Sequence, residues 1–151
     1  MKKWLWISVF AFAFLIGCSP ESSAKGKQTI TVYESDANAE YVIPREVSYK
    51  KGTEEALIHF IFNEVVAEKV KLIDYQIEDG TLVLNLDDGV RLVQGSAGGQ
   101  MFMGSLAESY FKNFPDVQEI MLLHNGSSKE QLDHVFIGQP ITREQSFQKP
   151  K

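Results

Sequence analysis

Two early segments of the chain alternate apolar and polar residues, which is the pattern of half-buried β-strands. Residues 28–34 (QTITVYE) place Ile30 and Val32 on one side and threonines on the other. Residues 40–49 (EYVIPREVSY) are extended again. Pro44 lacks an N–H, so we expect it at a bulge, an edge or a break of this second strand. The intervening SDANA predicts a turn, because Asp and Asn side chains bond the nearby backbone.

A helical spacing of apolar residues begins after Gly52. Thr53 can cap this helix, and the two glutamates that follow it favour the positive end of the helix dipole. His59 lies off the apolar stripe. The stripe that we expect to face the core consists of Leu57, Phe60, Ile61 and Val65.

The middle of the chain predicts a β-hairpin. Residues 70–77 and 81–86 have strand patterns on either side of Asp79-Gly80, a dipeptide typical of two-residue turns with positive φ at both positions. Residues 90–94 are expected to form a short extension. The side of the second strand that we expect to be buried carries Leu82, Leu84 and Leu86.

A glycine-rich run, residues 95–99, opens a second helix that we expect to reach Asn113. Ser96 is the expected N-cap. Pro115 ends the helix, because proline cannot continue it. The apolar stripe of this helix consists of Met103, Leu106, Ala107, Tyr110, Phe111 and Phe114.

Two more strands complete the pattern. Residues 117–123 (VQEIMLL) indicate a largely buried strand closed by a turn at Asn125-Gly126, and residues 134–137 (HVFI) indicate a last short strand. The order is therefore β-β-α-β-β-α-β-β. It predicts an α+β fold, a two-layer sandwich in which a mixed β-sheet carries two helices on one face. The residues of this single domain are 28–144.

The first residues, MKKWLWISVFAFAFLIGCSP, predict an export signal. Two lysines precede an uncharged apolar run that is shorter than the roughly 20 residues a membrane-spanning helix needs. The order of charge, apolar run, Gly17 and Cys18 resembles a bacterial lipoprotein signal, which implies cleavage after residue 17 and a diacylglycerol on the Cys18 thiol. The alternative is a buried or redox cysteine beside an uncleaved anchor.

A lipid on Cys18 determines the compartment and the rest of the organisation. Two acyl chains anchor a protein stably, so we expect the chain at the cell membrane, lipid-anchored on its extracytoplasmic face. Residues 18–27 are polar and are expected to form a flexible tether. Residues 145–151 are expected to form a disordered tail. Cys18 is the only cysteine, so the domain folds without a disulfide.

Charge removes one class of partner. Without residues 1–17 the chain has 134 residues, with 13 basic residues against 20 acidic ones, and hence a net charge of −7. Such an acidic surface disfavours nucleic acid, whose phosphates attract basic proteins.

The glycine run Gly95-Ser96-Ala97-Gly98-Gly99 is the candidate interaction loop. It lacks the Gly-Lys-Ser/Thr of a P-loop and the spacing of a dinucleotide fingerprint. Two glycines in a first helical turn cost about 1 kcal/mol each relative to alanine, so a contact should offset them. Close packing of backbone is one explanation. An anion or a partner's backbone at the helix N-terminus is the other.

The remaining polar residues do not predict catalysis, metal binding or a cofactor. Ser96 lacks the G-x-S-x-G context of a nucleophile elbow. His59, His124 and His134 have no metal-site spacing. Asp87-Asp88-Gly89 lacks the rest of a calcium loop and indicates a turn. We therefore do not expect an enzyme.

Four segments together resemble the GerMN domain, a module of sporulation and spore germination. They are VYESDANAEYVIPREV (32–47), YQIEDGTLVLNL (75–86), GSAGGQMFMGSLAESYFKNFPDVQEIMLL (95–123) and HVFIGQPITRE (134–144). One position departs from the family, which often has Glu where Gly99 stands here.

The resemblance implies a fold similar to the ring-building modules of secretion and sporulation assemblies. It also implies a lipoprotein that is not an enzyme and that binds an envelope protein complex. The alternative from a different class is an envelope binding protein for a small anionic or cell-wall ligand, with the glycine run as its site.

Overall fold

The computed structural model describes residues 26–132 and 134–150. The predicted leader, Cys18 and most of the tether lie outside these residues. Neither helix of the described part is both long enough and apolar enough to cross a bilayer. The elements in chain order are β1 (Lys27–Ser35), β2 (Val42–Lys50), α1 (Glu54–Val65), β3 (Leu72–Glu78), β4 (Thr81–Leu86), the 3-10 helix η1 (Asp88–Leu92), α2 (Ser96–Asn113), β5 (Glu119–His124) and β6 (Pro140–Thr142).

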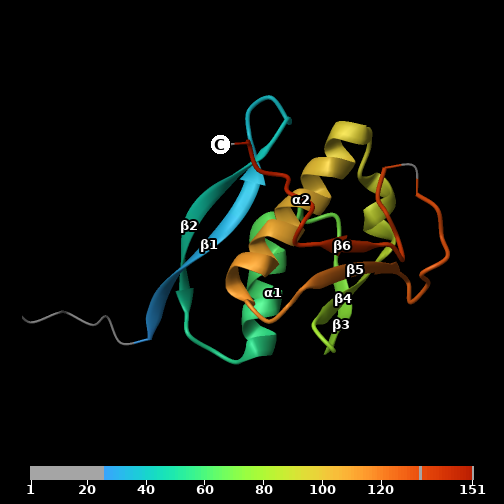
Figure 1. The fold of residues 1–151 in the computed structure, drawn as a ribbon. Coiled ribbons are helices and arrows are strands. Elements are labelled where there is room, and N and C mark those ends of the chain that lie inside the picture. Colours follow the sequence, from blue (N-terminus) through green and yellow to red (C-terminus); the bar gives the residue numbers. More distant parts are fainter. Residues whose placement is uncertain (1–25, 133, 151) are drawn as a thin grey trace, which may run out of the picture.

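The strands form two sheets. Strands β3, β4, β5 and β6 are neighbours in that order, and the pair β4–β5 is parallel while the outer pairs are antiparallel. Strands β1 and β2 form a separate antiparallel hairpin. The α+β prediction is confirmed, but the mixed sheet holds four of the six strands. Figure 1 shows the helices between the hairpin and this sheet.

The core lies between the four-stranded sheet and the helices. Alternate residues of β4 and β5 point to the helices, and Leu82, Leu84 and Ile120 are fully buried. Tyr110 is also fully buried, and its hydroxyl donates a 2.9 Å hydrogen bond to the carbonyl of Ile58, which joins α2 to α1. Burial of apolar surface at this scale is the main stabilising contribution of the fold.

The hairpin is separate because it packs directly on α2. Ile30 and Val32 of β1 are buried in the same core cluster as the helices. The backbone N–H of Tyr33 donates to the Ser109 hydroxyl at 2.8 Å, and the Asn113 amide donates to the Thr31 carbonyl at 2.7 Å. The outward backbone groups of β1, which could otherwise bond to another strand, thus bond to side chains of α2.

Local signals placed several elements correctly. The Thr53 hydroxyl accepts from the Ala56 N–H at 3.1 Å and caps α1. Asp79 and Gly80 have φ of 49° and 79°, as the predicted turn between β3 and β4 requires. Pro44 lies in β2 on an edge: Val42, two residues earlier, directs its N–H away from β1. The missing N–H of Pro44 therefore points the same way and removes no bond between the strands.

Other expectations were wrong by a residue or more. In α1 the buried positions are Ile58, Ile61 and Phe62, so the buried face is rotated from the predicted stripe toward later positions. Residues 90–94 do not extend β4. The Asp87 carboxylate instead accepts from the Gly89 N–H at 3.0 Å and begins the 3-10 helix η1.

The last strand and the tail also differ from the predictions. Within 134–137 only Ile137 forms a bridge, to Leu122, and the strand that pairs with β5 is β6, further along the chain. The tail, expected to be disordered, contacts the hairpin at Phe147 and Gln148. The Val42 N–H donates to the carbonyl of Phe147 at 3.0 Å, and the Phe147 ring packs against the core. The Phe147 ring and the hydrogen bond from Val42 thus hold this part of the tail against the domain.

Candidate functional site

Polar groups gather where the parallel strands β4 and β5 end. A parallel pair needs a crossover connection, which here contains α2. The segment η1, the start of α2 and the loop after β5 therefore all lie at the end of the sheet where β4 and β5 finish. In open α/β sheets this edge is where ligands bind. His124 ends β5, and Asp88 and Arg91 belong to η1 directly after β4.

His124 is the centre of a charged cluster at this edge. Its side chain is 2% exposed, its Nε2 lies 3.0 Å from the Asp88 carboxylate, and its Nδ1 contacts the Glu130 carboxylate. Glu130 also pairs with Arg91, and the Asn125 amide donates to Asp88 at 3.0 Å. Both ring nitrogens of His124 therefore face carboxylates, and Nε2 also lies 3.2 Å from the side-chain nitrogen of Asn125.

The cluster lowers the pKa of Glu130. The main cause is the hydrogen bond from His124, with further contributions from the charges of Arg91 and His124, while desolvation acts in the opposite direction. Each charged member has an opposite partner. The cluster therefore ties η1, β5 and the loop after β5 together.

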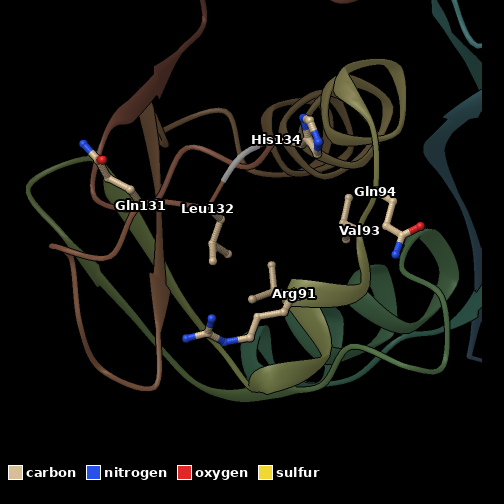
Figure 2. A pocket seen from close by; sticks show the side chains of 7 residues that line it. Arg91, Val93, Gln94, Gln131, Leu132 and His134 are labelled. Carbon is tan, nitrogen blue, oxygen red and sulfur yellow. The ribbon is translucent and has the colours of Figure 1, made fainter.

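A hollow of about 540 Å³ adjoins this cluster. Figure 2 shows Gln131 and Leu132 on one side, and Arg91, Val93 and Gln94 on the other, with His134 near the start of α2. The hollow has the size of a small-ligand site. Its one arginine is already paired with Glu130, which weakens it as a seat for an anion.

The predicted interaction loop is split by the structure. Gly95, Ser96 and Gly98 are exposed at the beginning of α2, and a Cβ at Gly95 or Gly98 would meet no atom within 4 Å. Gly99 is buried, and a Cβ there would lie 1.7 Å from the backbone oxygen of His134. Close backbone packing therefore accounts for Gly99, at the position where the GerMN family often has Glu.

The expected cap of α2 was wrong. The N-cap is Gly95, with φ of 74°, and no side chain bonds the first turn. A positive φ is unfavourable for serine but not for glycine. Ser96 and its neighbours in the first turn, up to Gly98, are exposed and follow Gln94, which lines the hollow. Cys18, the predicted lipid site, lies outside the described residues.

Sequence reasoning missed the charged cluster. The spacing of His124 in the sequence excludes only common metal sites, and within residues 26–132 and 134–150 no group of three or more His, Cys, Asp or Glu side chains is arranged to hold a metal ion. A signal was present, because residues after two parallel strands meet at one edge. Recognising it required the knowledge that β4 and β5 are parallel.

The other open feature is the edge strand β3. Within the described part of the chain no strand pairs with the outer side of β3, which begins with a bulge between Leu72 and Asp74. Ile73, in that bulge, is 49% exposed. Burial and then the carboxylates of Glu55 and Glu54 raise the pKa of Tyr75, which places negative charge beside this edge.

Solved structures share this fold. The tandem GerMN domains of the sporulation protein GerM from Bacillus subtilis align with a TM-score of 0.61 at 17% identity, over 85% of this chain and 50% of that chain. The first GerMN domain of that protein aligns with a TM-score of 0.59 at 14% identity, over 78% and 99%. A candidate lipoprotein from Clostridium perfringens aligns with a TM-score of 0.51 at 14% identity, over 79% and 89%.

The chain therefore has the fold of a GerMN domain, as the resemblance of its four segments predicted, and it spans half the length of the tandem structure. No protein-family model and no curated protein sequence matches the chain. At these identities the likeness concerns the fold, and the function rests on the surfaces described above.

Proposed function

We propose that this chain is a lipid-anchored interaction module of the GerMN type on the extracytoplasmic face of the cell membrane. It would dock onto an envelope protein complex in sporulation, spore germination or another envelope assembly. The proposal assigns it no catalytic step and no nucleic-acid partner. The observation that carries it is the outer edge of β3, with which no strand of the described residues pairs, on a fold shared with domains of a sporulation protein.

The edge of β3 has the chemistry for strand addition. Glu78 and Thr81 flank a two-residue turn and form the first pair of the hairpin. The backbone N–H and C=O groups of successive residues in a strand point alternately to its two sides. Because those of Glu78 point to β4, those of Ile77 and Tyr75 point away from β4, toward the side where a partner strand would add. The acidic residues near Tyr75 favour a partner strand flanked by lysine or arginine.

Site-specific crosslinking in living cells tests this surface. A photoreactive amino acid replaces Gln76 on β3, Gln100 on α2 or Lys129 in the loop after β5, all of them exposed. We expect capture of a protein from position 76 alone. Capture from position 100 alone would move the docking surface to the start of α2, and equal capture from all three would contradict a specific surface.

The anchor is tested separately. Cys18→Ala should release the chain into the medium without lowering the melting temperature of the domain, because the lipid is attached outside residues 28–144. Membrane retention of the Cys18→Ala chain would overturn the lipid attachment.

The start of α2 supports a second candidate, a binding protein for a small anionic or cell-wall ligand. The supporting observation is a first helical turn that no side chain caps, next to the hollow of Gln94 and His134. Titration with inorganic phosphate or peptidoglycan fragments, followed by amide NMR, distinguishes the candidates. Saturable shifts confined to Gly95, Ser96 and Gly98 would favour this one, and unchanged amides there would exclude it.

A further inference from the structure

The end of the chain occupies a groove between β2 and α2. Figure 1 shows the C-terminus beside the turn of the β1–β2 hairpin, after the chain has crossed α2. Gln148 forms a parallel bridge with Val42, whose N–H donates to the carbonyl of Phe147 at 3.0 Å. The segment thus pairs with the outer side of β2 through one isolated parallel bridge.

The side chain of Phe147 fills an apolar site between β2 and α2. Phe147 packs on Tyr33, Val42 and Met101, each no more than 7% exposed. Its ring lies over Gly104 of α2, where a Cβ would approach the Cβ and Cγ atoms of Phe147 to 2.8 Å. The space for the ring therefore depends on a glycine in the helix.

The backbone of the tail is also hydrogen-bonded at this site. The carboxylate of Glu108 accepts the N–H of Phe147 at 3.1 Å and the side-chain amide of Gln148 at 2.6 Å. The Glu108 carboxylate thus accepts the N–H of Phe147, and the Val42 N–H donates to the C=O of Phe147, so both backbone polar groups of Phe147 have partners. Strand addition with a side-chain pocket is a common mode of peptide recognition.

Within the described part of the tail, its contacts with β2 and α2 are confined to two residues. Gln145 and Ser146 are exposed, so Phe147 and Gln148 make the contacts that hold residues 146–150 to β2 and α2. A hollow of about 360 Å³, lined partly by Tyr33, Glu108 and Gln148, adjoins the tail.

We propose that the groove between β2 and α2 is a peptide-binding site that the chain's own tail fills, and that an extended segment of a partner protein displaces it. The segment carries an aromatic residue with a neutral or basic neighbour, because the tail sequence is QSFQK and the groove presents the carboxylate of Glu108. This site is distinct from the β3 edge, which lies on the other sheet.

Hydrogen exchange of the full chain tests whether the tail opens. We expect the amides of Val42 and Phe147 to exchange at least about tenfold faster than that of Leu84 in β4, because local opening exposes them without global unfolding. Exchange of all three at one rate would make the tail an integral part of the fold and would overturn the proposal.

Binding is measured with a labelled peptide of residues 143–150 and the full chain carrying Phe147→Ala, whose folding is verified by circular dichroism. We expect saturable binding to this opened chain and at least about tenfold weaker binding to the unchanged chain, where the attached tail competes. The same peptide with Phe147→Ala should not bind. Absence of binding to the folded, opened chain would overturn the proposal.

Two glycines of α2 provide the matched control. Adding Gly104→Ala to the opened chain should abolish peptide binding, whereas adding Gly98→Ala should not, because a Cβ at Gly98 has free space. Binding that survives Gly104→Ala would place the peptide elsewhere. A concentration-dependent dimer of the unchanged chain that Phe147→Ala abolishes would identify the occupant as a second copy's tail and contradict a partner protein.

Discussion

Neighbouring glycines at the start of α2 have opposite roles. A Cβ at Gly99 would lie 1.7 Å from the His134 backbone oxygen, while one at Gly98 would meet no atom within 4 Å. We therefore expect Gly99→Ala to lower the free energy of unfolding by about 1–3 kcal/mol through overpacking. Gly98→Ala should raise it by up to about 1 kcal/mol through helix propensity. Urea unfolding measures both, and equal effects would contradict the packing of residue 134 on α2.

Glu130 makes the free energy of unfolding depend on pH in the acid range. Its folded-state pKa is lowered from 4.5, chiefly by the hydrogen bond from His124, so its contribution is complete above pH 4.5. The contribution is lost as the pH falls through the lowered pKa, since the unfolded chain takes up the proton first. Unfolding measured between pH 3 and 7 should therefore show a shallower acid loss for Glu130→Gln than for the unchanged chain.

Glu46 provides the control for this acid dependence. It is an exposed residue of β2, so Glu46→Gln should leave the acid profile of stability unchanged. An identical profile for Glu130→Gln and the unchanged chain would show that the contact between His124 and Glu130 contributes no proton linkage.

At the scale of elements, Arg143 closes the C-terminal end of α2. Its Nε donates to the Val117 carbonyl at 2.6 Å, and its Nη2 donates to the carbonyls of Phe111 and Phe114 at 3.0 and 2.8 Å. The guanidinium also lies 4.8 Å from the centre of the Phe111 ring. The last carbonyls of a helix have no partner within it, so one side chain joins α2, the loop after it and the end of β6.

Loss of this arginine should destabilise the domain. We expect Arg143→Ala, and also Arg143→Lys, to lower the free energy of unfolding by about 2 kcal/mol, because a lysine cannot reproduce the fork of donors. Arg45→Ala is the comparison. It removes partly exposed ion pairs with Glu34 and Glu64, and such pairs contribute about 1 kcal/mol or less. A smaller loss at residue 143 than at residue 45 would contradict the capping role.

The elements that the sequence predicted correctly are those with local causes. The cap at Thr53, the turn at Asp79-Gly80 and the stripe of α2 depend on residues within a few positions of one another. The displaced last strand is different. Residues 134–137 contact β5 through one bridge at Ile137, residues 140–142 form the strand, and this choice depends on the position of β5 rather than on a local pattern. The packing of Phe147 depends on Gly104, more than 40 positions earlier, and no local pattern indicates it.

At the scale of the molecule, the candidate surfaces arise from topology. The edge strand β3, the cluster around His124 and the groove of Phe147 each combine elements from distant parts of the chain. The glycine run could be recognised from the sequence because its residues are consecutive. Its partner, the backbone of residue 134, could not. The resemblance to GerMN domains predicted the fold because it draws on the order of four segments rather than on any single one.

The two sheets are held to one another through α2, and this arrangement predicts how the molecule unfolds. Ser109 accepts the buried N–H of Tyr33 at 2.8 Å, and Asn113 donates to the Thr31 carbonyl at 2.7 Å. Ser109→Ala leaves that N–H without a partner, which should lower the free energy of unfolding by about 1–3 kcal/mol. The exposed Ser48 of β2 provides the control, and Ser48→Ala should change stability little.

Hydrogen exchange then shows which strands lose stability in Ser109→Ala. If α2 holds the hairpin to the rest of the domain, Ser109→Ala should accelerate exchange in β1 and β2 more than in β4 and β5, because the hairpin acquires an opening of its own. An equal acceleration in all four strands would mean that hairpin and sheet unfold only together. In that case the burial of Ile30 and Val32, rather than the polar bonds to α2, couples the two sheets.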